Sequence, residues 1–215
     1  LLEAARLKPR RKIVFASSVS GFSANEKVCE TTLPAPLSPY GASKLHGEYL
    51  CKAWSHSFDL RVAVMRLTNA YGPEFFSNHG VVSEAMRSAV AGSSFKLYGS
   101  GNASRDFIFT EDICDAIYKA STDEPIDEKT AGSFELYQIA SGKEITVNML
   151  LEKIDLLLSQ RGLAPLVIDK QEARTGEIDA SCGNSDKAKE ILGWSSNTSL
   201  EEGLSRTLDW YLAQK

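Results

Sequence analysis

The sequence predicts an α/β protein, with part of a doubly wound parallel sheet followed by a smaller C-terminal α+β lobe. Residues 12–16 (KIVFA) and 61–67 (RVAVMRL) are nearly continuous apolar runs, which are typical of strands buried on both faces. A segment with the features of a helix separates them. Strand, helix and strand at this spacing form a right-handed unit of a parallel sheet.

The remaining elements follow in order from local signals. Residues 1–8 resemble the last turns of a helix that ends at Pro9. Ser38 and Pro39 suit an N-cap and a first helical position, so a helix is expected from there to about residue 57. After residue 72 shorter elements are expected: a helix at 80–91, a strand pair at 95–98 and 105–109, a helix opened by 110–112, a strand at 134–139, and helices at about 146–160, 185–192 and 199–213.

The composition is that of an ordinary globular protein. The chain has 215 residues, 43% of them hydrophobic and 24% charged, with a formal net charge of -4. This mild acidity argues against nucleic acid or an anionic membrane as a partner. The longest apolar runs are too short to cross a bilayer, and no signal-peptide pattern opens the chain, so a cytoplasmic protein is expected. The four scattered cysteines are expected to be buried free thiols, and no metal site is predicted.

Tyr40 and Lys44 form the first candidate site. They are four residues apart, so on a helix their side chains share one face. A phenol with a pKa near 10 is a poor base at neutral pH, but an adjacent ammonium favours the phenolate and lowers that pKa by ~1–3 units. Such a tyrosine can remove a hydroxyl proton while hydride leaves the same carbon. Because Tyr and Lys are common residues, the spacing alone is weak evidence.

The context of this pair strengthens the prediction. Ser17 and Ser18 directly follow the predicted strand 12–16, where the carboxyl end of a parallel strand faces the ligand crevice. Four blocks then occur in a set order along the chain: VFASSVSGF, SPYGASK, MRLTNAYGP and SRDFIFTEDICDAI. In these blocks the chain resembles the extended short-chain dehydrogenases, the NAD-dependent epimerases and dehydratases of nucleotide sugars. The resemblance covers essentially the whole chain and implies a Rossmann-type sheet.

The resemblance assigns roles to individual residues. Ser18 matches the catalytic serine or threonine that lies four residues before an aromatic, here Phe22. Tyr40 matches the general base, and Lys44 matches the lysine that binds the nicotinamide ribose. The residues expected to contact NAD are Ser17, Tyr40, Lys44 and Leu67.

The resemblance also implies a site for the nucleotide sugar. Ser18 is expected to bind the sugar, and Asn69 resembles the asparagine that contacts the phosphate. Arg105 and Arg174 resemble two arginines that clamp the diphosphate, which agrees with the bidentate binding of phosphate by guanidinium groups. Asp106 and Asp112 are assigned structural roles, in an ion pair or turn and at a helix N-terminus.

The family's glycine-rich dinucleotide turn is not found in this sequence. The only candidate, at 99–101 (GSG), lies between two predicted strands and opens no helix. The chain is therefore expected to be the C-terminal two-thirds of the family's fold, and to bind NAD poorly by itself. Residues 1–72 are expected to form the second half of the NAD-binding domain. Residues 73–215 are expected to form mainly the substrate lobe, with 105–121 and 134–140 returning to the first domain.

The choice of reaction rests on the residues after Ser18. The resemblance implies that dehydratases place an Asp-Glu pair there, whereas this chain has Val19 and Ser20. Epimerisation at C4 through a keto intermediate is therefore the first prediction. The alternatives are an NAD-dependent dehydrogenase, reductase or dehydratase of a nucleotide sugar, and a non-catalytic nucleotide-sensing or protein-binding module. By analogy with the family, a homodimer is expected.

Overall fold

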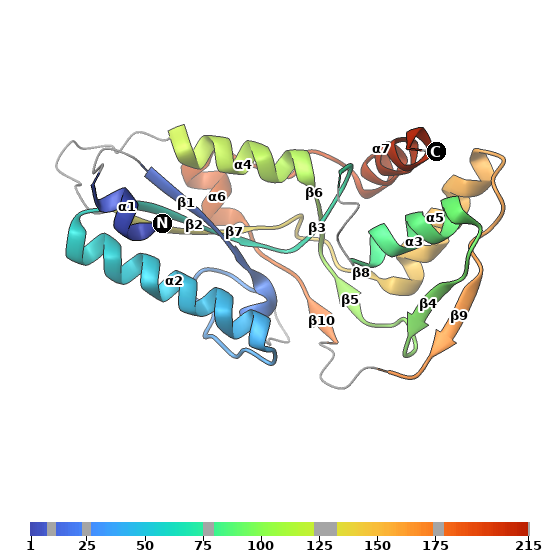
Figure 1. The fold of residues 1–215 in the computed structure, drawn as a ribbon, viewed down its shortest axis with the longest axis horizontal. Helices are drawn as coiled ribbons and strands as arrows, with labels where there is room; N and C mark the ends of the chain where they lie inside the picture. Colours follow the sequence, from blue (N-terminus) through green and yellow to red (C-terminus); the bar gives the residue numbers. More distant parts are fainter. Residues whose placement is uncertain (8–11, 23–26, 75–79, 123–132, 174–178, 215) are drawn as a thin grey trace.

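A three-stranded parallel sheet forms one end of the molecule in the computed structural model (Figure 1). The structure describes residues 1–7, 12–22, 27–74, 80–122, 133–173 and 179–214. The sheet contains β1 (Lys12–Ser18), β2 (Arg61–Leu67) and β7 (Phe134–Ile139), in the order β1-β2-β7. Every pair is parallel, and Ser18 lies beside Leu67 and Leu67 beside Ile139. The predicted parallel sheet is confirmed, and its carboxyl ends meet at one edge.

Helices cover both faces of this sheet. Alternate residues of β2 pack on opposite faces of the sheet. Val62 and Val64 belong to one buried cluster, whereas Ala63 and Met65 belong to another. The first cluster is closed by α1 (Leu2–Arg6) and α2 (Pro39–Phe58). The second is closed by α4 (Thr110–Thr122) and α6 (Asp186–Leu192). The doubly wound arrangement predicted from the apolar strands is therefore present.

The helix α2 begins as its sequence predicts. Ser38 adopts an extended N-cap conformation, and its hydroxyl accepts a hydrogen bond from the Gly41 amide at 3.0 Å. Such a cap stabilises a helix by about 1 kcal/mol. The helix ends at Phe58, where Asp59 adopts a left-handed conformation with φ of 53°. This start fixes the position of Tyr40 in the first helical turn.

A second apolar core lies in the lobe at the other end of the molecule (Figure 1). It is formed by α3 (Val81–Ala91), α5 (Val147–Gln160) and α7 (Leu200–Ala213). Phe95 and Leu97 of β4 (Phe95–Tyr98) also belong to it. Leu150, Ile154, Leu158 and Leu208 are fully buried in this cluster.

The predicted pairing of residues 95–98 with 105–109 is wrong. The strand β4 pairs in parallel with β9 (Ile168–Gln171), which the sequence analysis did not predict. The second segment is divided at the buried Asp106 into two strands, β5 (Ser104–Arg105) and β6 (Phe107–Phe109). Asp106 interrupts the strand because its carboxylate is bonded to the backbone of other segments.

The two halves of the divided segment pair with different partners. The strand β5 lies between β10 (Ala180–Ser181) and β8 (Ile145–Thr146), and β6 pairs with β3 (Asn69–Tyr71). The glycine-containing segment 99–101 forms a turn between β4 and β5 and opens no helix, as predicted.

The cysteines are all free, but only Cys51 and Cys182 are buried. The expectation of burial is wrong for Cys29, which is partly exposed, and for Cys114, which is exposed on α4. None of the helices in the described ranges combines the length and the apolar character that crossing a bilayer requires.

Candidate active site

A cavity of about 410 Å³ opens at the carboxyl ends of β1 and β2. It brings together most of the predicted site residues that the structure describes: Ser17, Ser18, Tyr40, Lys44, Leu67 and Asn69. The ends of neighbouring parallel strands and the start of the connecting helix are where ligands bind in open α/β sheets. The cavity therefore lies where the fold is expected to place a ligand.

Tyr40 and Lys44 enter this cavity from the first turns of α2. The Lys44 ammonium donates a hydrogen bond to the Ala16 carbonyl oxygen at 2.9 Å, and it lies 5.6 Å from the centroid of the Tyr40 ring. Tyr40 itself is 56% exposed, so its phenol is accessible to a ligand. The ammonium therefore lies beside the Tyr40 ring, on the same face of the helix.

Ser18 ends β1 and acts as the N-cap of a short 3-10 helix, η1 (Val19–Gly21). Its hydroxyl accepts a hydrogen bond from the Ser20 amide at 3.2 Å and lies 3.0 Å from the Ser20 hydroxyl. The side chain of Val19 packs in an apolar cluster with Phe22, Val28 and Leu45, whereas Ser20 lines the cavity. Of the two residues after Ser18, only Ser20 therefore presents its side chain to the cavity.

A glycine allows α2 to approach this segment closely. A Cβ atom at Gly41 would lie only 2.1 Å from the Ser20 carbonyl oxygen. Because the obstacle is backbone, any side chain at this position would push the start of α2 away from η1. The close contact therefore sets the distance between the helix that carries Tyr40 and the strand end that carries Ser18.

Asn69 lies in β3, beside Phe107 of β6. Its side-chain amide nitrogen donates a hydrogen bond to the Asp106 carbonyl oxygen at 3.2 Å, which orients the side chain at the cavity wall. The Asp106 carboxylate is fully buried and accepts hydrogen bonds from the amides of Ser141, Gly142 and Gly183. Its structural role therefore depends on backbone amides from two loops.

Of the two predicted arginines, the structure describes only Arg105. Arg105 lies in β5 and donates a hydrogen bond to the Ser104 carbonyl oxygen at 2.8 Å, and it is not among the residues that line the Tyr40 cavity. Arg174 lies outside the described residues. Their proposed contact with a diphosphate stays a prediction.

The cavity also includes residues that the sequence did not predict. Thr68 and Ala70 follow Leu67 at the end of β2, and Phe107 lies in the strand beside Asn69. The start of α3 closes the remaining side with Gly80, Val81, Val82 and Ser83. Position after a predicted strand could have indicated Thr68, but Phe107 and α3 reach the cavity through tertiary packing.

Two side chains near this region have pKa values that differ from their usual ones. Hydrogen bonds with the hydroxyls of Thr31 and Thr32 lower the pKa of the Cys29 thiol. Burial raises the pKa of the Tyr71 phenol above its usual value. Tyr71 belongs to the apolar core of the lobe, and it does not line the Tyr40 cavity.

Comparison with known proteins places this chain in a family. The family model described as GDP-mannose 4,6 dehydratase matches residues 1–207. The chain is 34% identical over 215 residues to a putative UDP-glucose 4-epimerase of Methanocaldococcus jannaschii, covering 98% of this chain and 66% of that protein. It is 30% identical over 194 residues to a dTDP-glucose 4,6-dehydratase of Shigella flexneri, covering 86% of this chain and 50% of the relative.

Solved structures give the same result for the fold. MoeE5 in complex with UDP-glucuronic acid and NAD matches with a TM-score of 0.88 and 27% identity, covering all of this chain and 69% of that one. The UDP-glucose 4-epimerase of Thermotoga maritima with UDP-glucose matches with a TM-score of 0.86 and 28% identity, covering 100% of this chain and 67% of that one. This chain spans about half to two thirds of the curated relatives it matches.

Proposed function

This chain belongs to the GDP-mannose 4,6-dehydratase family, and we propose from that premise that it carries the catalytic residues of an NAD-dependent nucleotide-sugar epimerase acting at C4. Relatives named as epimerases and as dehydratases are both similar to it, so the family alone leaves the reaction open. The choice between them rests on the groups that line the Tyr40 cavity.

The lining of the cavity is the observation that carries this proposal. The described residues that line it include hydroxyl, phenol, amide and ammonium groups but no carboxylate, imidazole or thiol. Removing water from a sugar needs an acid and a base in addition to the hydride step, and serine is a poor choice for both. Epimerisation needs one base, a keto intermediate, and return of hydride to the opposite face.

The chain's own residues supply the proton transfer. Tyr40 removes the proton from the sugar 4-hydroxyl, and the Lys44 ammonium stabilises the phenolate. Ser18 donates a hydrogen bond to the same sugar oxygen and holds it at the cavity wall. In the reverse step the tyrosine returns the proton to the 4-keto oxygen. Asn69 lines the same cavity and is proposed to bind the substrate's phosphate.

The cavity fits the nicotinamide end of NAD. Lys44 offers an ammonium with three donors, one of which is bonded to Ala16, and Ser17 and Leu67 line the same wall. NAD would accept hydride from the sugar carbon and return it. We assign residues 1–72, with 105–121 and 134–140, to the cofactor side. The rest of 73–215 is assigned mainly to the substrate lobe, where Arg105 and Arg174 are proposed to bind the diphosphate.

The direct test is Tyr40→Phe in the full-length protein, with several nucleotide sugars and NAD. Loss of the base is expected to lower kcat by ~10²–10⁴-fold. Tyr118→Phe is the matched control, because Tyr118 is 67% exposed on α4 and does not line the cavity. Retention of near-wild-type turnover by Tyr40→Phe would exclude Tyr40 as the base.

The product identifies the reaction. An epimeric sugar in the NMR spectrum, without accumulation of NADH, supports the epimerase. A 4-keto-6-deoxy sugar identifies a dehydratase, and steady NADH release identifies a dehydrogenase. If no nucleotide sugar is converted, a non-catalytic module is favoured.

Two further proposals concern cofactor affinity and assembly. The 215-residue chain alone is expected to bind NAD weakly, and calorimetry showing tight binding would contradict this.

A cytoplasmic homodimer is proposed by analogy, with the exposed Tyr49 and Leu50 of α2 as candidate contacts. Light scattering of the full-length protein tests the dimer.

A further inference from the structure

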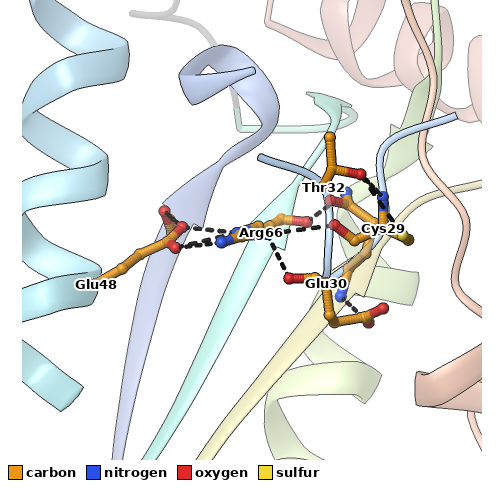
Figure 2. Close-up of polar contacts among 7 residues, drawn as sticks. Cys29, Glu30, Thr32, Glu48 and Arg66 are labelled. Carbon is orange, nitrogen blue, oxygen red and sulfur yellow. Dashed lines mark hydrogen bonds and ion pairs between the residues drawn. The ribbon is translucent and has the colours of Figure 1, made fainter. Parts of the chain in front are cut away.

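A buried ion pair lies one helical turn beyond Lys44. The Arg66 guanidinium donates three hydrogen bonds to the Glu48 carboxylate, the shortest at 2.7 Å (Figure 2). The side chains of Arg66 and Glu48 are only 7% and 6% exposed. Glu48 belongs to α2 and Arg66 to β2, so the pair joins the helix to the sheet.

Glu48 also contacts the strand that ends in the candidate catalytic serine. The buried Ser17 hydroxyl donates to the Glu48 carboxylate at 2.5 Å. Ser17 immediately precedes Ser18, and Glu48 lies four residues after Lys44 on the same face of α2. One carboxylate therefore links the helix that carries Tyr40 and Lys44 to the strand end that carries Ser18.

Arg66 holds the segments that follow β1. Its guanidinium stacks on the Phe22 ring at 4.2 Å from the centroid, and it donates to the carbonyl oxygens of Cys29 and Glu30 at 3.3 and 3.4 Å (Figure 2). Phe22 comes directly after η1, the short helix next to Ser18. The same guanidinium therefore contacts Phe22, directly after η1, and the carbonyl oxygens of Cys29 and Glu30 further along the chain.

The strand β7 completes the network. The backbone amide of Gln138 donates to the Glu30 carboxylate at 2.7 Å. The side-chain amide of Gln138 donates to the Arg66 carbonyl oxygen at 2.8 Å. Gln138 is fully buried. All three strands of the sheet and helix α2 thus contribute to one set of polar contacts beside the cavity.

A buried ion pair is weak evidence for stability. Desolvation of both charges offsets most of their attraction, and well-packed apolar residues often replace such a pair without loss of stability. What apolar residues cannot reproduce is the directional set of bonds to Ser17, Cys29 and Glu30. The network is therefore better explained by the geometry that it imposes.

We propose that Glu48 and Arg66 are positioning residues, which hold Ser18 on β1 in register with Tyr40 and Lys44 on α2. The proposal rests on the proposed function of that site. Neither residue lines the cavity, so they act through Ser17 and η1 and do not touch substrate. Displacement of catalytic groups by about 1 Å can lower a rate by about 10²-fold, so modest disorder in this segment would have a large effect.

The test compares kcat, KM and thermal stability in the full-length protein. Glu48→Gln weakens the link to β1, and a double variant, Glu48→Met with Arg66→Met, removes it. We expect kcat to fall ~10–100-fold with KM within about threefold, because the ground-state contacts remain. The double variant is expected to retain a near-wild-type Tm while kcat stays low.

The matched control is Glu135→Gln on β7, which breaks the partly exposed pair with Lys187 of α6, where the two groups are 2.9 Å apart. It is expected to change neither kcat nor Tm appreciably. A double variant with both wild-type kcat and wild-type Tm would overturn the proposal. So would variants whose lower activity follows the folded fraction alone.

Amide hydrogen exchange separates this proposal from the choice of reaction. In the 215-residue chain, the Ser20 amide bonds to the Ser18 hydroxyl and the Phe22 amide to the Val19 carbonyl oxygen. Glu48→Gln is expected to speed exchange at these two amides at least tenfold, while protection in the lobe is unchanged. Unchanged exchange at both amides would contradict the positioning role even if the enzyme proves to be a dehydratase.

Discussion

The sheet region and the lobe are held together in different ways. Around the Tyr40 cavity, side chains are positioned by a close backbone contact at Gly41 and by buried polar groups such as Glu48 and Arg66. In the lobe, α3, α5 and α7 pack through a continuous apolar cluster. Apolar packing is non-directional and tolerates small shifts, whereas hydrogen bonds and backbone contacts fix positions closely. Substitutions in the two regions should therefore separate activity from stability.

The largest expected effect is at Asp106, where the two regions meet. Its carboxylate accepts hydrogen bonds from the amides of Ser141, Gly142 and Gly183. Asp106→Asn removes the charge and turns an amide NH₂ toward donors, so unfolding free energy should fall by roughly 3–5 kcal/mol. Urea denaturation measures this change. The control is Asp115→Asn, at a partly exposed position on α4, where a change of less than about 0.5 kcal/mol is expected.

The next effect should appear in stability alone. Leu158 is fully buried in the lobe cluster, and Leu158→Ala should lower the free energy of unfolding by about 3 kcal/mol. Because the substitution lies in the lobe, kcat per folded molecule should change less than about twofold. Leu156, on the same helix, is 62% exposed and serves as the control for Leu→Ala. A large loss of kcat in folded Leu158→Ala protein would remove the distinction between the regions.

Gly41→Ala should instead act mainly on kcat, in contrast to Leu158→Ala. The new Cβ would clash with the Ser20 carbonyl oxygen, so the start of α2 must move and carry Tyr40 with it. We expect kcat to fall by about 100-fold, equivalent to ~2.7 kcal/mol in the barrier. The comparison is Gly203→Ala in α7, where the obstacle is the Tyr71 hydroxyl and the cost should appear mainly in Tm. Equal effects of both substitutions on kcat would contradict this interpretation.

The sequence predicted the elements that depend on local signals. The apolar runs of β1 and β2 and the Ser38-Pro39 helix start each have a physical cause within a few residues. Pairings between distant segments were not predictable in this way. The strand β4 pairs with β9 about seventy residues later, and Asp106 divides a predicted strand because loops from elsewhere donate to it.

The residues around the site also divide into those that local signals predict and those that depend on pairing between distant segments. Ser18, Tyr40 and Lys44 could be selected from spacing and context, and the structure places all three around one cavity. Glu48 would be expected on an exposed surface, because charged side chains are rarely buried, whereas Arg66 lies within the run 61–67 that predicts a buried strand. Each is buried only because the other is present, and that pairing depends on the register of α2 against β2. A single sequence carries no signal for such a pair.

The smallest expected effect contrasts an exposed ion pair with the buried one. Lys153 of α5 and Glu201 of α7 lie 2.6 Å apart in the lobe, and the Glu201 side chain is 63% exposed. The hydrogen bond from Lys153 lowers the pKa of Glu201. Because the folded-state pKa is depressed, the pair stabilises the protein above the unfolded pKa, and this contribution is lost as pH falls through the folded value. Glu201→Gln should therefore cost at most about 0.5 kcal/mol at pH 7 and less in acid.

Thermal melting of both proteins from neutral pH down to about pH 3 tests this expectation, because carboxylates titrate in that range. The difference in Tm between wild type and Glu201→Gln should narrow as the carboxylate becomes protonated. Added salt should also narrow it, because exposed charges are screened. The Glu48–Arg66 pair is only 6–7% exposed, so salt should leave the effect of Glu48→Gln nearly unchanged. Equal sensitivity of both pairs to salt would show that the two regions do not differ in this respect.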